Sequence, residues 1–268
     1  MEKAILKTLK YADIFDYPLK SYEIHKWLIK KQVPLQKIQK SLSKFQEYKG
    51  YFFLKSKSQV LKRIKNTGVS KGLFLKAKIF TQILKIVPWI KLVGISGGLA
   101  MGNAGKIDDI DLFLITSKNR LWLSRMFSNL LLFLVRRKRG AKNVKGKFCL
   151  NIFIAEDRLT QKKDLYTAHE ILQMKVIWER EGTYQRFLEE NEWVFKYLPN
   201  WTTNIRLTEK NNSLIINHQS LIDLMERLAK WIQLKYMGKP DGFERIEDGA
   251  LYFHPVDYRT KVLAALDK

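Results

Sequence analysis

Two glycines and two aspartates lie close together near the middle of the chain, in an order that can bind phosphate and metal. Gly97 and Gly98 follow the apolar run 90–95, and Asp109 and Asp111 open a second apolar run. Backbone without a Cβ atom can approach a phosphate closely. Residues i and i+2 of a strand point to the same side, about 7 Å apart. Because paired carboxylates repel unless a hard cation neutralises them, the pattern predicts a site for Mg²⁺ or Mn²⁺ and a phosphate-bearing substrate.

The same segment resembles the signature of the nucleotidyltransferase superfamily that includes DNA polymerase beta. That signature has a glycine followed by Gly or Ser, a gap of nine to thirteen residues, and an Asp-hydrophobic-Asp/Glu-hydrophobic run. Here Gly97-Gly98 is followed by a ten-residue gap and then by Asp109-Ile110-Asp111-Leu112. The motif covers about sixteen residues, and the order of strands and helices extends a looser resemblance over residues 88–155.

The resemblance implies a role for each residue of the motif. Gly97 and Gly98, with Ser96 beside them, would bind a nucleoside triphosphate (NTP), and Asp109 and Asp111 would hold Mg²⁺ or Mn²⁺. The metal would polarise the α-phosphate during in-line attack by an acceptor hydroxyl. The implied enzyme moves a nucleoside monophosphate from the NTP to a hydroxyl on RNA, protein or a small molecule.

One position departs from the family pattern. Catalytic members carry a third acidic residue on a neighbouring strand, where this chain offers Asn151, which we expect on the same strand face as Cys149 and Phe153. An amide oxygen can ligate a metal but cannot accept a proton at neutral pH. Glu156 or Asp157, just beyond the strand, could replace the missing carboxylate. The alternative to an enzyme is a non-catalytic nucleic-acid-binding regulator that uses a degenerate nucleotidyltransferase fold as a nucleotide sensor or scaffold.

Hydrophobic periodicity predicts the elements that position these residues. Strands are expected near 90–95, 111–115 and 148–154, with a helix at 70–87 that Pro88 stops and a long helix from Arg120 to Val135. This order predicts an α/β (α+β) core with a small mixed sheet. Helical periodicity dominates from Asp164 onward and predicts a helical C-terminal region, with good stretches at 164–180, 183–197, 217–237 and 256–267.

The N-terminal third is predicted to be a winged helix: three short helices followed by a β-hairpin. The first helix is expected at 2–12, the second is capped by Ser21, the third starts after Pro34 and ends at Gly50, and a strand follows at 51–54. The predicted domains are a winged-helix module at 1–68, a nucleotidyltransferase core at 69–160 and the helical region at 161–268.

Charge gives this module candidate partners. The chain has a net charge of +23, and residues 1–88 hold 20 basic but only 5 acidic side chains. Lys37, Lys40 and Lys44 would share one face of the third helix and could contact nucleic-acid phosphates. As an alternative to nucleic-acid binding, the lysines would form a solvated helix face, and the module would dock protein partners.

The remaining features point to a cytoplasmic protein without a transmembrane segment. The single cysteine, Cys149, cannot form an internal disulfide, and the N-terminus lacks an apolar signal core. The apolar stretch 121–135 is too short to cross a bilayer and contains Arg125; a buried helix is favoured over a membrane-surface one. The histidines have no metal-ligand spacing and are expected at helix surfaces or boundaries: His25, His169, His218 and His254.

Overall fold

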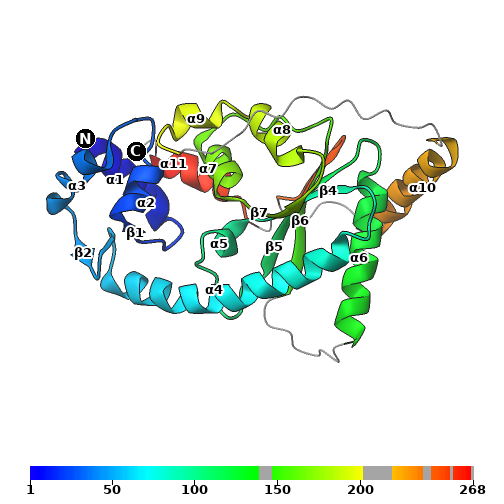
Figure 1. The fold of residues 1–268 in the computed structure, drawn as a ribbon, viewed down its shortest axis with the longest axis horizontal. Coiled ribbons are helices and arrows are strands. Elements are labelled where there is room, and N and C mark those ends of the chain that lie inside the picture. The colour runs from blue at the N-terminus through cyan, green and yellow to red at the C-terminus, as the bar shows by residue number, and fades with distance from the viewer. Residues whose placement is uncertain (139–146, 202–218, 238–242, 254–255, 267–268) are drawn as a thin grey trace.

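The computed structural model is a mixed α/β fold with a large sheet at one end and a helical module at the other (Figure 1). The described residues are 1–138, 147–201, 219–237, 243–253 and 256–266. Helix α4 (Lys57–Leu84) runs from the N-terminal module to the sheet, and the N- and C-terminal ends lie close together (Figure 1). The fold is therefore α+β in class, as predicted.

The N-terminal module contains three helices and a small three-stranded sheet. The sheet has the antiparallel order β1-β3-β2. Ile24, Trp27 and Leu28 are buried in the core of this module. The elements are α1 (Glu2–Asp13), β1 (Leu19–Lys20), α2 (Ser21–Lys26), α3 (Leu35–Gln39), the 3-10 helix η1 (Leu42–Lys44), β2 (Glu47–Tyr48) and β3 (Tyr51–Phe52). The order of helices and hairpin agrees with the prediction, and the winged-helix assignment itself stays a prediction.

The third helix is much shorter than predicted, because the hairpin uses residues that we expected to be helical. Lys49 and Gly50 both have positive φ, +54° and +77°, and they form the two-residue turn between β2 and β3. The three lysines consequently do not share one helix face. Lys37 lies in α3, Lys40 caps it, and Lys44 lies in η1, where its Nζ pairs with Glu2 at 2.7 Å.

Helix α4 begins thirteen residues before the predicted start at residue 70. Ser56 and Gln59 form a capping box, and the helix starts directly after Ser56. The helix ends at Leu84, before Pro88. It continues without a break through residues 68 and 69, where the winged-helix module was predicted to end and the core to begin. One helix therefore contributes to both parts of the molecule.

The large sheet has six strands in the order β7-β4-β5-β6-β9-β8. Strands β5 and β6 are parallel, and the other neighbouring pairs among the described strands of this sheet are antiparallel. The predicted strands are present as β4 (Ile90–Ile95), β5 (Ile110–Thr116) and β6 (Phe148–Ala155). The other three lie in the region predicted to be helical, which was wrong there: β7 (Lys175–Glu179), β8 (Arg245–Glu247) and β9 (Ala250–Tyr252). Each of these short strands is stabilised by pairing with another strand: β7 pairs with β4, β9 with β6, and β8 with β9. Local periodicity carries no information on such pairings.

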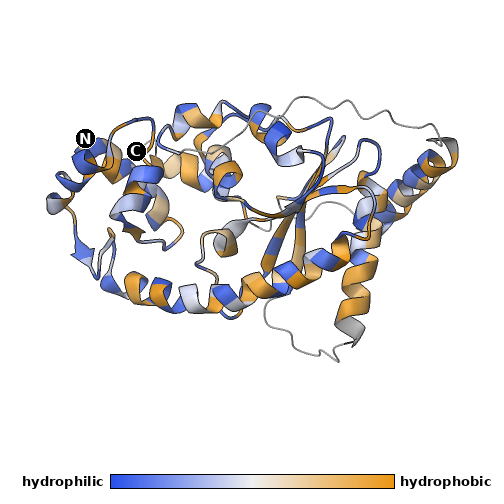
Figure 2. Ribbon diagram, in the orientation of Figure 1, coloured by the Kyte–Doolittle hydropathy of each residue, from blue (hydrophilic) through white to orange (hydrophobic). Residues whose placement is uncertain are grey.

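Helices cover both faces of this sheet. Helices α4, α6 (Leu121–Lys138) and α10 (Gln219–Met237) pack on one face. The opposite face is covered by the N-terminal module together with α7 (Leu165–Gln173), α8 (Thr183–Glu189), α9 (Val194–Tyr197) and α11 (Tyr258–Leu266). The sheet strands and α6 are among the most hydrophobic ribbons in Figure 2. Within the described residues, no helix has the length and apolar character required to cross a bilayer.

Candidate active site

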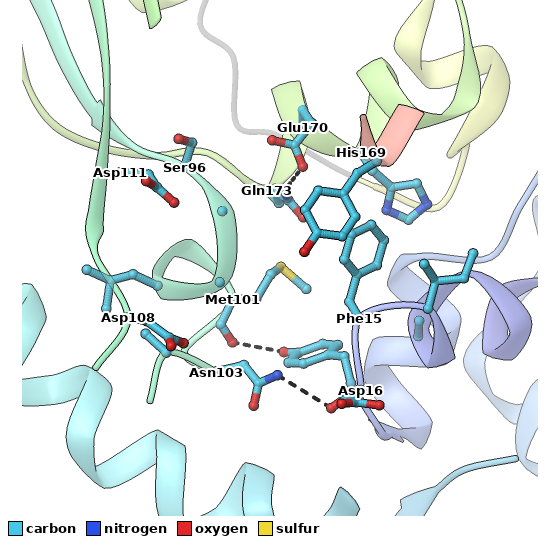
Figure 3. Close-up of a pocket in the computed structure, with 18 of the residues that line it drawn as sticks. Phe15, Asp16, Ser96, Met101, Asn103, Asp108, Asp111, His169, Glu170 and Gln173 are labelled. Carbon is cyan, nitrogen blue, oxygen red and sulfur yellow. Dashed lines mark hydrogen bonds between the residues drawn. The ribbon is translucent and has the colours of Figure 1, made fainter. Parts of the chain in front are cut away.

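A cavity of about 820 Å³ lies between the sheet, α7 and the N-terminal module (Figure 3). Its lining comes from α1, from the short helix α5 (Gly97–Ala100) and the loop that follows it, from β5 and β6, and from α7. The cavity brings together all six residues that the sequence analysis singled out for the site: Ser96, Gly97, Gly98, Asp109, Asp111 and Asn151.

Gly97 approaches Asp111 so closely that only glycine fits. Its φ is +60°, and a Cβ atom at this position would lie 2.6 Å from Oδ2 of Asp111. At Gly98, by contrast, a Cβ atom would meet no atom within 4 Å. The Ser96 amide donates to the carbonyl of Asp111 at 3.0 Å, while the buried Ser96 Oγ has no hydrogen-bond partner among the described residues. The glycine turn and the carboxylate thus form a cradle that a side chain would fill.

Asn151 contacts Asp111 through its side chain. Its Nδ2 donates to Oδ1 of Asp111 at 2.5 Å, and its Oδ1 accepts from Sγ of Cys149 at 2.6 Å. The pairing of β5 with β6 skips residue 151, so Asn151 is the extra residue of a β-bulge. The bulge turns Asn151 and Ile152 to the same side of the sheet, and Phe153 therefore packs in the core on the opposite face. The expectation that Phe153 shares a face with Asn151 was wrong.

The two aspartates differ in environment. Asp109 is exposed and accepts a hydrogen bond from the amide of Lys147 at 3.2 Å. Asp111 is half-buried; burial, followed by the charge of Asp109, raises its pKa to about 6, although the Asn151 hydrogen bond opposes the shift. The Asp111 carboxyl group is therefore partly protonated near neutral pH.

This donor set fits a divalent cation that shares its ligands with a substrate. No group of three or more His, Cys, Asp or Glu side chains in the described part of the chain could enclose a metal ion. Mg²⁺, however, commonly binds one or two carboxylates and takes its other oxygens from water and phosphates. Asp109 and Asp111 would supply the protein ligands, with Ser96 Oγ and the Asn151 amide nearby.

Helix α4 holds the loop after the glycine turn. Asn66 donates from Nδ2 to the carbonyl of Asn103 at 2.8 Å. One turn later, Ser70 accepts from the Ala104 amide at 3.0 Å and lies 3.3 Å from its carbonyl. The loop between α5 and β5 is therefore hydrogen-bonded to helix α4 at Asn103 and Ala104.

The N-terminal module binds the same loop through a buried polar network. Tyr17 donates from its hydroxyl to the carbonyl of Met101 at 3.0 Å. Arg63 binds the Tyr17 hydroxyl at 2.8 Å and forms an ion pair with Glu23 at 2.5 Å, and the Arg63 and Glu23 side chains are only 7% and 11% exposed. The module thus forms a wall of the cavity rather than a separate unit.

Helix α7 supplies a polar wall that the sequence analysis did not identify. Glu170 accepts a hydrogen bond from Gln173, and burial together with the Asp111 charge raises its pKa to about 7. Figure 3 shows Glu170 and Gln173 across the cavity from Asp111. Two polar residues one turn apart in α7, Glu170 and Gln173, were the available signal.

His169 is a buried residue next to this cavity, not the surface or boundary residue that we expected. Its ring stacks on Tyr11 at 3.7 Å and on Trp27 at 5.1 Å between centroids. Burial lowers its pKa to about 3, and Nε2 has no hydrogen-bond partner among the described residues. The ring is therefore neutral near pH 7.

Other candidates from the sequence lie away from the cavity. Glu156 pairs with Arg186 at 3.2 Å and Asp157 with Lys118 at 3.9 Å, so neither replaces the missing carboxylate. His25 contacts the carbonyl of Val33 at 2.7 Å through Nε2. His218 and His254 lie outside the described residues.

No protein-family model and no curated protein matches this sequence. The resemblance to nucleotidyltransferases consequently rests on the motif, and function has to be argued from the geometry of the cavity.

Proposed function

We propose that this protein is a Mg²⁺-dependent nucleotidyltransferase, which moves a nucleoside monophosphate from an NTP to an acceptor hydroxyl and releases pyrophosphate. The observation that carries the proposal is the cradle between Gly97 and Asp111. Its floor is backbone without a side chain, and its wall is a carboxylate paired with a second carboxylate two residues earlier. Backbone without a side chain can lie close to a phosphate, and paired carboxylates attract the divalent cation that would accompany it.

Each residue of the cradle has a role in this proposal. The backbone at Gly97 and Gly98, with Ser96 Oγ, binds and orients the triphosphate. Asp109 and Asp111 hold Mg²⁺, which supplies Lewis-acid stabilisation of charge on the reacting phosphate. Asn151 orients Asp111 through its amide. A cavity of about 820 Å³ is in the range of small-molecule sites, and it leaves room for an acceptor beside the nucleotide.

Calorimetry tests the metal site without knowledge of the acceptor. We expect Mg²⁺ and NTP to bind the wild-type protein with positive coupling, since each supplies ligands or charge that the other needs. The double variant Asp109→Asn/Asp111→Asn should lose the coupling. Asp157→Asn, which removes a carboxylate outside the cavity, is the matched control and should retain it. Equal coupling in all three proteins would refute the assigned site.

The second candidate function is a nucleotide-sensing regulator that binds nucleic acid. It is favoured by Asn151, because the strand position where catalytic members carry a third acid holds an amide. Incubation with α-³²P-labelled NTPs and Mg²⁺ in a cell lysate separates the two functions. A transferase labels an acceptor, whereas a sensor binds the NTP without labelling.

Nucleic-acid contact stays a prediction. If Lys37, Lys40 and Lys44 contact phosphates, replacement of all three by Gln should flatten the salt dependence of nucleic-acid binding.

A further inference from the structure

Glu170 faces the carboxylate pair from the opposite wall of the cavity. Its helix, α7, is held at its start by Asp164, which accepts from the Thr167 amide at 2.8 Å and from Nε of Arg259 at 2.6 Å. Ala168 and Leu172 anchor the other side of the helix in the core. Figure 3 shows the Glu170 carboxylate at the cavity surface, on the far side of Ser96 from Asp111. The helix therefore presents a fixed carboxylate to the site.

The hydrogen bonds of Glu170 leave one carboxylate oxygen available. Gln173 donates from Nε2 to Oε1 of Glu170, so Oε2 can receive an incoming hydroxyl. The groups that act on this carboxylate are Asp111 from β5, Tyr11 from α1 and Tyr166 on α7 itself. None of the three is a cation; among the described residues, the charge that acts on Glu170 is the negative charge of Asp111.

The other carboxylates that line the cavity already have partners or a different role. Asp16 pairs with Lys62 at 3.2 Å and accepts from Gln59. Asp108 accepts from the Gly105 amide at 2.8 Å. Asp109 and Asp111 are the proposed metal ligands. Among the described residues lining the cavity, Glu170 is the remaining carboxylate.

We propose that Glu170 is the general base of the transfer reaction and takes over the role that Asn151 cannot perform. This inference rests on the proposed nucleotidyltransferase function. The acceptor oxygen forms a bond to the α-phosphorus while its proton passes to Oε2 of Glu170. The bond from the α-phosphorus to the bridging oxygen breaks, and pyrophosphate leaves with the electron pair. Glu170 then returns the proton to water. The base thus approaches from a helix across the cavity instead of from the strand beside the metal ligands.

The test compares Glu170→Gln with Glu189→Gln, an exposed carboxylate on α8 away from the cavity. The assay follows transfer of label from α-³²P-labelled NTPs to acceptors in lysate. We expect Glu170→Gln to lower the transfer rate by about 10²- to 10⁴-fold. Its affinity for Mg²⁺ and NTP should stay within about threefold of wild type. Glu189→Gln should match wild type in both measurements.

Two further readouts distinguish a base from a residue that only supports the fold. The transfer rate of the wild-type protein should rise with pH until Glu170 is ionised, and this rise should be absent from Glu170→Gln. Glu170→Asp, which keeps a carboxylate, should show the same rise of the transfer rate with pH, at lower absolute rates. If Glu170→Gln does not fold, the pH profile of Glu170→Asp decides.

The outcomes separate this inference from the proposed function. A Glu170→Gln rate within threefold of wild type, with an inactive Asp109→Asn/Asp111→Asn protein, overturns the role of Glu170 and leaves the transferase function standing. Loss of Mg²⁺ and NTP binding in Glu170→Gln also overturns it, because the residue would then act in binding. If wild type labels no acceptor, both proposals fall, and the calorimetric coupling shows whether the nucleotide site survives.

Discussion

Substitution of Gly97 by Ala tests the cradle by its effect on stability. An Ala Cβ would meet Oδ2 of Asp111 at 2.6 Å, and the φ of +60° disfavours any residue with a Cβ atom. The left-handed conformation costs about 1–2 kcal/mol. Displacement of Asp111 from the Asn151 amide, 2.5 Å away, costs about 1.5–3 kcal/mol more if that bond is lost. We therefore expect the free energy of unfolding to fall by about 2–5 kcal/mol.

Gly98→Ala is the matched control. No atom lies within 4 Å of a Cβ atom there, so we expect a change within about 1 kcal/mol in either direction. Urea unfolding, followed by circular dichroism, measures both variants against wild type. The same proteins titrated with Mg²⁺ and NTP should show weaker binding for Gly97→Ala alone. Equal stability of the two variants would refute the close approach of Gly97 to Asp111.

Three further substitutions probe the surroundings of the cavity. Arg63→Met leaves Glu23 buried without its partner and should destabilise the protein by about 3–5 kcal/mol in thermal or urea unfolding, whereas an unaltered midpoint would contradict the buried pair. His169 has a folded pKa of about 3, below its unfolded value near 6.5, so its contribution to stability is present above pH 6.5 and is lost as pH falls toward 3. The His169→Phe protein should therefore lose less stability than wild type between pH 6.5 and pH 3. Parallel plots of stability against pH for the two proteins would contradict the burial of the ring. Asn151→Asp places a third carboxylate against Asp111, so the melting temperature of this variant in EDTA should be lower than that of wild type. Addition of Mg²⁺ should raise the melting temperature of the variant more than that of wild type. A melting temperature of the variant that does not change with Mg²⁺ would contradict the proposed metal position.

The motif residues could be located from the sequence because their geometry is local. An apolar run that ends at Ile95, just before Ser96, and a second that starts at Ile110 are both visible in the sequence, and the alternation of a strand would put Asp109 and Asp111 on one side. The five motif residues line the cavity for this reason, whereas Asn151, 40 residues beyond Asp111, is brought there by the pairing of β5 with β6. The role of Asn151 in a catalytic site stays a prediction.

Elements stabilised by distant partners were predicted poorly. Strands β7, β8 and β9 are five residues or shorter and depend on pairing with other strands: β7 with β4, β9 with β6, and β8 with β9. The hairpin turn at Lys49-Gly50 interrupted a periodicity that otherwise favours a helix. In each case the competing hydrogen bonds are made by tertiary or turn contacts, and these override helix propensity.

The charge, the α+β class, the three central strands and the succession of a glycine turn and two aspartates could be predicted from the sequence, because they depend on composition and on residues close together in the chain. The surroundings of the aspartate pair depend instead on tertiary contacts. The bulge at Asn151 re-aims a side chain through strand register, and Glu170 reaches the site from 59 residues beyond Asp111 through helix packing. Burial, which shifts the pKa of both Asp111 and Glu170, is a property of the assembled walls and of no single segment.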